Sequence, residues 1–170
     1  MRKTTLAWIF LGLIYGSSAM GMTLTSTAFS EGGKIPDIYS CDGKDMAPDL
    51  TWSAVPIGTK SFALIMDDPD APSGLWTHWV LFNIPANVTK LASNAALPEG
   101  ALIGNNSWGR AQYNGPCPPY NKTHRYNFKL YALNTVLKLP SGASAAQVMG
   151  ASEHHIMGQV KLMGKYERSH

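Results

Sequence analysis

The chain has 170 residues, of which 45% are hydrophobic and 15% are charged, and its formal net charge is +3. This length is enough to bury the core of one domain. The near-neutral balance and the lack of any run of Lys or Arg argue against a nucleic-acid partner and against a polybasic membrane patch.

The first 21 residues have the layout of a secretory signal peptide. The positive pair Arg2 and Lys3 precedes an apolar run over residues 6–15, which ends in small side chains up to Ala19. The uncharged stretch is shorter than the roughly 20 residues that span a bilayer, which favours cleavage after residue 19 or 21 over an uncleaved anchor. We expect residues 22–170 to form a single periplasmic or secreted domain without stable membrane insertion.

Short runs of β-branched and aromatic residues, separated by Pro, Gly, Asn and Asp clusters, recur through the rest of the chain. This punctuation predicts an all-β protein, an antiparallel sandwich or barrel. The clearest predicted strands cover residues 61–66, 76–84, 125–133 and 160–166. The stretch 86–109 is interpreted as a long surface excursion.

Cys41 and Cys117 are the chain's two cysteines. An even pair in a chain with an export signal favours a disulfide between them, and two free buried thiols are the alternative. A zinc site is poorly supported, because neither cysteine belongs to a CxxC or CxxH motif.

Two carboxylates follow the first strong strand. Asp68 and Asp70 lie among prolines that hold the loop in a preset conformation. On the next strand, alternation predicts that His78 and Val80 share one face and that Trp79 lies on the other. A rigid loop that carries carboxylates at a strand end is a common way to orient a binding group.

A second stiff loop, residues 113–119, precedes His124, Arg125 and Tyr126. Alternation places His124 and Tyr126 on one face and Arg125 on the other, where it can form an ion pair. Imidazoles and a phenol are suitable donors to phosphate, and an adjacent Asp can hold a histidine in its donating form. We therefore expect a pocket for a small anion around Asp68, Asp70, His78 and His124.

One helix is predicted to begin near Ser144 and to run to about residue 155. Gly150 weakens its middle by up to about 1 kcal/mol relative to Ala, so the helix should depend on packing against the sheet.

The motifs DPDAP at 68–72, WTHW at 76–79, and GPCPP at 115–119 followed by HRY at 124–126 resemble the signature regions of the phosphatidylethanolamine-binding protein family, in its bacterial Raf-kinase-inhibitor-like branch. The resemblance extends over residues 23–168. It implies an antiparallel Greek-key β-sandwich with one or two short helices near the C-terminus. It also implies a pocket for a phosphate monoester or a phospholipid head group.

The resemblance assigns roles to individual residues. Asp70 and Arg125 match positions that are expected to pair structurally. The ligand-binding positions that it implies are Asp68, His78, Gly115, Pro118, His124 and Tyr126.

Two classes of function remain open. The first is a non-enzymatic binder of an anionic ligand that acts as a modulator or inhibitor of a protein partner. The second is a weak hydrolase or metal-dependent enzyme that uses the Asp and His cluster. The chain has no GxSxG elbow, Walker loop or HExxH helix, so we expect no catalytic residue, no cofactor and no metal.

The export signal predicts the N-terminus of the mature protein. Cleavage should leave Met20 or Met22 as the first residue of protein recovered from the periplasm or medium. N-terminal sequencing measures this, and an intact Met1 on membrane-bound protein would contradict it.

Overall fold

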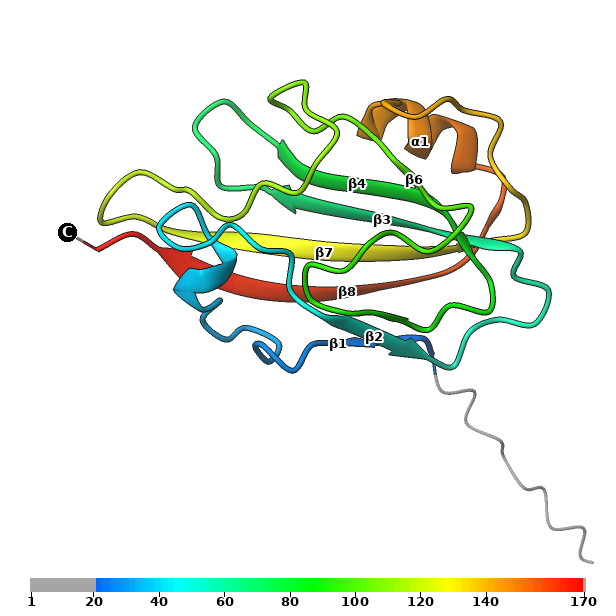
Figure 1. The fold of residues 1–170 in the computed structure, drawn as a ribbon, viewed down its shortest axis with the longest axis horizontal. Helices are drawn as coiled ribbons and strands as arrows, with labels where there is room; N and C mark the ends of the chain where they lie inside the picture. Colours follow the sequence, from blue (N-terminus) through cyan, green and yellow to red (C-terminus); the bar gives the residue numbers. More distant parts are fainter. Residues whose placement is uncertain (1–20, 170) are drawn as a thin grey trace, which may run out of the picture.

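The computed structural model describes residues 21–169, so the predicted signal peptide lies outside the described residues except for its last position. Two antiparallel sheets form a β-sandwich (Figure 1), which confirms the expected all-β fold class. The strands are β1 (Thr23–Thr25), β2 (Leu50–Ser53), β3 (Ser61–Asp68), β4 (Trp76–Pro85), β5 (Lys90–Leu91), β6 (Leu102–Ile103), β7 (Thr123–Leu133) and β8 (Ile156–Glu167). The helices are the 3-10 turn η1 (Asp37–Tyr39) and α1 (Ala145–Ser152).

The smaller sheet has three strands in the order β1-β2-β5, and the larger has five in the order β6-β4-β3-β7-β8. β3 is the central strand of the larger sheet, and all of its residues are buried. A strand covered on both faces needs a continuous apolar run, so its charged residues, Asp67 and Asp68, stand at its end. The four strands predicted from the sequence all occur; β3, β4 and β7 are one or two residues longer than expected, and β8 begins four residues earlier and ends one residue later.

The main core lies between the two sheets. Trp52 of β2 packs edge-on against Phe62 of β3 with ring centroids 5.4 Å apart, and Phe29 packs against Phe128 of β7 at 5.6 Å. Each fully buried side chain of this size contributes about 1.5–3 kcal/mol to stability. A smaller cluster joins α1 to the other face of the large sheet and contains Ala63, Val80, Phe82, Leu133, Leu137, Ala143 and Val148.

The expected alternation along β4 is wrong at its beginning. Trp79 belongs to the core between the sheets, whereas Val80 packs in the cluster with α1. The register between β3 and β4 shifts between Thr77 and Trp79, and this irregularity lets His78 and Trp79 face the same side. His78 therefore contacts Tyr126, a residue of the main core, rather than sharing a face with Val80.

The stretch 86–109 is less irregular than predicted. It contributes β5 to the smaller sheet and β6 to the larger one, and its Leu91 and Asn106 are buried. Two-residue strands carry too little alternation to be seen in a sequence.

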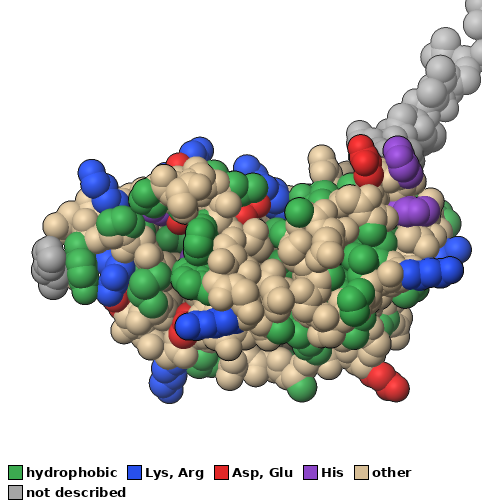
Figure 2. Space-filling view, turned by 90° about the horizontal axis from the view of Figure 1, so that it is seen from above, with side chains coloured by type: hydrophobic (Ala, Val, Ile, Leu, Met, Phe, Trp, Pro, Cys, Tyr) green, Lys and Arg blue, Asp and Glu red, His purple; other side chains and the backbone are tan. Residues whose placement is uncertain are grey.

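The helix α1 begins where predicted, with Ser144 and Gln147 forming a capping box, but it ends at Ser152 rather than near residue 155. A turn at 153–155 is needed there because β8 starts at Ile156. Within the described part of the chain, no helix has the length and apolar character needed to cross a membrane. On the face shown in Figure 2, Lys and Arg side chains are scattered among apolar and acidic ones and form no continuous basic patch.

A disulfide joins Cys41, just after η1, to Cys117 in the loop before β7. The two Cα atoms are 5.4 Å apart across a sequence separation of 76 residues. The bridge therefore ties the loop that follows η1 to the loop that leads into β7.

Loss of this disulfide should lower the free energy of unfolding. For a loop of this length the chain-entropy model sets a ceiling of about 4.5 kcal/mol. Urea denaturation with and without reductant measures the effect. A variant with both Cys41→Ser and Cys117→Ser should have the same unfolding midpoint as the reduced parent, and reductant should not change that midpoint. Equal midpoints for oxidised and reduced parent protein would contradict the prediction.

Candidate functional site

A cavity of about 370 Å³ opens at the end of the sandwich where β3 ends and where β4 and β7 begin. These strand ends meet because Asp68 pairs with Trp76 across β3 and β4, while β7 runs antiparallel along the other edge of β3. Surface hollows of similar size occur elsewhere, but this one gathers a carboxylate and two imidazoles. Its lining consists of Asp68, Ala71, Pro72, Ser73, Trp76, His78, Trp108, Cys117, Pro118, Pro119, His124 and Arg168.

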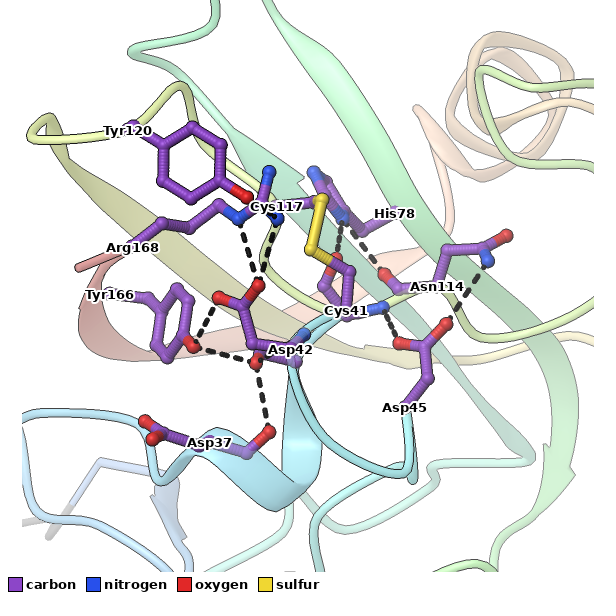
Figure 3. The surroundings of a disulfide bond; sticks show 12 residues. Asp37, Cys41, Asp42, Asp45, His78, Asn114, Cys117, Tyr120, Tyr166 and Arg168 are labelled. Atoms are coloured by element: carbon purple, nitrogen blue, oxygen red, sulfur yellow. Dashed lines mark hydrogen bonds and ion pairs between the residues drawn. A yellow bond between two sulfur atoms is a disulfide. The ribbon is translucent and has the colours of Figure 1, made fainter. Parts of the chain in front are cut away.

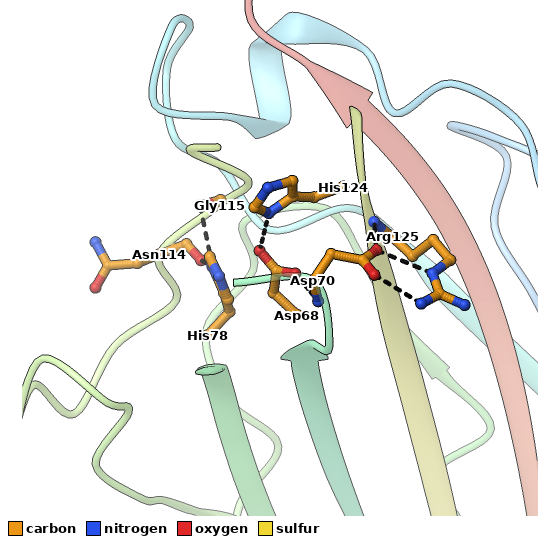
Figure 4. Close-up of polar contacts among 7 residues, drawn as sticks. All are labelled: Asp68, Asp70, His78, Asn114, Gly115, His124 and Arg125. Carbon is orange, nitrogen blue, oxygen red and sulfur yellow. Dashed lines mark hydrogen bonds and ion pairs between the residues drawn. The ribbon is translucent and has the colours of Figure 1, made fainter. Parts of the chain in front are cut away.

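A buried polar contact of the site joins His124 to Asp68. The imidazole Nδ1 donates to the carboxylate Oδ2 at 2.7 Å, and the two residues are only 6% and 3% exposed (Figure 4). The other oxygen of Asp68 accepts the backbone N–H of Asp70 at 2.8 Å. With Nδ1 occupied, Nε2 is the atom with which His124 can bind a ligand.

His78 is held in a different way. Its Nδ1 lies 2.8 Å from the carbonyl oxygen of Asn114 and 3.1 Å from that of Gly115. Carbonyls only accept, so Nδ1 carries the proton. Burial lowers the pKa of His78, which leaves the ring neutral near pH 7 with an unprotonated Nε2. The ring packs edge-on against Trp108 and Tyr126, with centroids at 5.0 and 5.2 Å.

The loop that supplies these carbonyls is fixed by a carboxylate. Asp45 accepts the backbone N–H of Gly115 at 2.6 Å and the side-chain amide of Asn114 at 3.4 Å. A side chain at position 115 would place its Cβ only 2.1 Å from the carbonyl oxygen of Tyr39. Gly115 is therefore required by the close approach of two backbones, and it acts on the site through His78.

The structure pairs Asp70 with Arg125 beside the cavity, in the arrangement that the sequence resemblance implies. Arg125 Nε and Nη2 donate to the two carboxylate oxygens at 2.9 and 2.6 Å, and the Arg125 backbone N–H donates at 2.8 Å. These bonds lower the pKa of Asp70 to about 2. The pair ties the loop after β3 to β7.

Tyr126 is buried, and within residues 21–169 its hydroxyl has no hydrogen-bond partner. Burial, together with nearby Asp68, raises the pKa of Tyr126, so the hydroxyl keeps its proton. Of the predicted ligand-binding residues, the structure brings Asp68, His78, Pro118 and His124 to the cavity lining and sets Gly115 and Tyr126 against His78.

Sequence reasoning missed Trp108 and Arg168, which also line the cavity. Trp108 is 41% exposed and packs edge-on against Trp76 with centroids 5.4 Å apart. It stands alone among small and polar residues, so no periodic pattern marks it. Arg168 follows the last strand and lies far in sequence from the other site residues, so no local pattern connects it with them.

Comparisons with known proteins agree with this architecture. A family model described as phosphatidylethanolamine-binding protein matches residues 25–167. A relative named UPF0098 protein in Methanothermobacter thermautotrophicus is 51% identical, with 86% of this chain and 99% of the relative aligned. LppC of Mycobacterium tuberculosis, named as a candidate lipoprotein, is 41% identical, with 88% of this chain and 74% of LppC aligned.

Two crystal structures also match closely. The candidate phosphatidylethanolamine-binding protein homologue CT736 of Chlamydia trachomatis has a TM-score of 0.83 and 42% identity, covering 87% of this chain and 98% of CT736. YbcL of E. coli, described as a new member of the mammalian PEBP family, has a TM-score of 0.83 and 37% identity, covering 88% of this chain and 99% of YbcL.

The ion pair at Asp70 should make stability depend on pH. Because folding lowers the pKa of Asp70 from 3.8 to about 2, its stabilising effect is present above the upper value and is lost as the pH falls through the lower one. The stability difference between the parent and Asp70→Asn should therefore shrink on acidification, as measured by urea denaturation. Arg125→Gln should remove the same pH dependence. A stability difference between the parent and Asp70→Asn that does not change with pH would contradict the stabilising role of the ion pair.

Proposed function

The chain belongs to the phosphatidylethanolamine-binding protein family, and on this premise we propose that it binds a small phosphate-type anion in the cavity at the strand ends. The observation that carries the proposal is the buried His124–Asp68 pair at the cavity wall. Nδ1 of His124 donates to Asp68, so when the ring is protonated its Nε2 can donate to an anion. The cavity volume of about 370 Å³ lies within the usual range for small-molecule sites.

The two histidines would have complementary roles. His124 would donate to a phosphate oxygen, and such a charge-assisted bond contributes about 1.5–3 kcal/mol. His78 offers a lone pair, which suits a hydroxyl on a protonated phosphate or an ammonium group. A phosphate monoester and a phospholipid head group both supply such atoms, and Pro118 and Trp108 would form apolar walls around them.

We also propose that the protein acts outside the cytoplasm, in the periplasm or medium, and modulates or inhibits a protein partner. The disulfide supports the location, since such bonds persist in oxidising compartments. The relative LppC is named as a candidate lipoprotein, which also supports a location outside the cytoplasm.

A hydrolase or metal-dependent enzyme is the second candidate. Within residues 21–169, no three His, Cys, Asp or Glu side chains stand close enough together to hold a metal ion. The site also lacks a nucleophile beside a general base in the arrangement that covalent catalysis uses. These observations favour binding. Metal analysis of the purified protein before and after chelator treatment separates the two candidates.

Replacing either imidazole should weaken binding. Calorimetric titration with O-phosphorylethanolamine should show a loss of about tenfold or more for His124→Ala and for His78→Ala. Affinity of the parent should fall as the pH rises through the range in which histidines lose their proton.

His154→Ala is the matched control, because this exposed residue follows α1 far from the cavity and should leave affinity unchanged. If both cavity variants bind as well as the parent, the proposed binding site is wrong.

A further inference from the structure

Arg168 lies at the cavity although it is distant from the other site residues in sequence. It follows directly after β8 and stands one residue beyond the range that the family model matches, 25–167. Its backbone is held by a bridge to Tyr120 and by the N–H of Asn121, which donates to its carbonyl at 3.0 Å. These contacts bring its guanidinium into the same lining as His78 and His124.

The guanidinium is held in one orientation. Nε and Nη2 both contact Asp42 Oδ1 at 2.9 Å, and Nη2 donates to the Tyr120 hydroxyl at 3.0 Å (Figure 3). The ring of Tyr120 covers its face at 4.2 Å. Within residues 21–169 Nη1 makes no hydrogen bond, so its two N–H groups are left to meet a ligand. The side chain is only 21% exposed, which strengthens any ionic contact it makes.

Asp42 is itself fixed by its surroundings. The hydroxyl of Tyr166 donates to its Oδ2 at 2.8 Å and accepts from Ser40 Oγ at 2.8 Å. The neighbouring Cys41 is bonded to Cys117 of the cavity wall. The loop that holds Arg168 is therefore anchored to the same wall that the ligand would contact.

Arg168 differs from the other charged groups of the cavity because its positive charge does not depend on pH. Among the described lining residues, Asp68, His78, His124 and Arg168 can carry charge. Burial keeps His78 neutral, and the charge of His124 requires protonation. Asp42 raises the pKa of Arg168, whose guanidinium is charged at any pH at which the protein is folded. Asp42, Tyr120 and Tyr166 are the other titratable groups that pack around it.

We propose that Arg168 is a ligand-contacting residue that makes the pocket select phosphate monoesters over phosphodiesters. This inference rests on the proposed function. The cavity then offers two donors, Arg168 and His124, and one acceptor, His78. A monoester has three terminal oxygens and can carry two negative charges, so it can accept from both cationic donors at full charge. A diester has two terminal oxygens and only one negative charge, so the fixed positive charge of Arg168 favours it less than the monoester.

Calorimetry with two ligands tests the proposal. O-phosphorylethanolamine is the monoester and glycerophosphoethanolamine is the diester. The parent should bind the monoester about tenfold more tightly or better. Arg168→Gln should weaken monoester binding by about tenfold and remove most of the preference. Arg168→Lys keeps the charge but loses the planar fork, and should show a loss of about threefold and a reduced preference.

Lys161→Gln is the control, because it removes the same charge from an exposed position of β8. It should change neither affinity nor preference. Arg168→Lys keeps the test decisive if Arg168→Gln does not fold, as judged by circular dichroism.

The outcomes separate the two proposals. If both Arg168 variants bind the monoester with parental affinity and preference while His124→Ala does not, the role of Arg168 is wrong and the anion pocket stands. If the parent binds neither ligand, the proposed function itself fails.

Discussion

Burial of Asp68 at the end of the central strand is the constraint on which the site depends. β3 is covered on both faces, so its terminal carboxylate is only 3% exposed and would be costly without partners. The chain supplies two: the His124 imidazole at 2.7 Å and the backbone N–H of Asp70 at 2.8 Å. The orientation of His124 follows from this requirement. The position of the cavity follows as well, because the strands on either side of β3 must begin where β3 ends.

A second set of polar contacts, part-buried or exposed, holds the loops on the other side of the cavity from β3. Asp45 fixes the loop whose carbonyls hold His78, and Asp42 fixes Arg168. The disulfide at Cys41 joins both sets to the loop before β7. A site whose loops are already ordered loses little conformational entropy when a ligand binds, which favours affinity for a ligand as small as a phosphate ester.

Local sequence features predict the long strands and the two stiff loops, because periodicity and proline act over a few residues. They predict Asp68, His78 and His124 for the same reason. The β4 irregularity at Thr77–Trp79 and the short strands β5 and β6 depend on pairing partners, which periodicity does not reveal. The pairing of Asp42 with Arg168 spans 126 positions and leaves no local signal. The residues missed at or around the cavity are those fixed by such distant contacts: Asp42, Asp45, Trp108 and Arg168.

The two histidines look alike in the sequence but differ in their chemistry. His124 donates to a carboxylate, while His78 faces two carbonyls in a buried position that lowers its pKa. A pair of cationic imidazoles would suit any anion, whereas one donor and one acceptor demand a ligand with both an acceptor and a donor atom. Acetate ions and phosphodiesters lack the donor on the anionic group. The difference between the two environments, rather than the count of histidines, therefore supports the proposal of a ligand that carries a hydrogen-bond donor beside its anionic group.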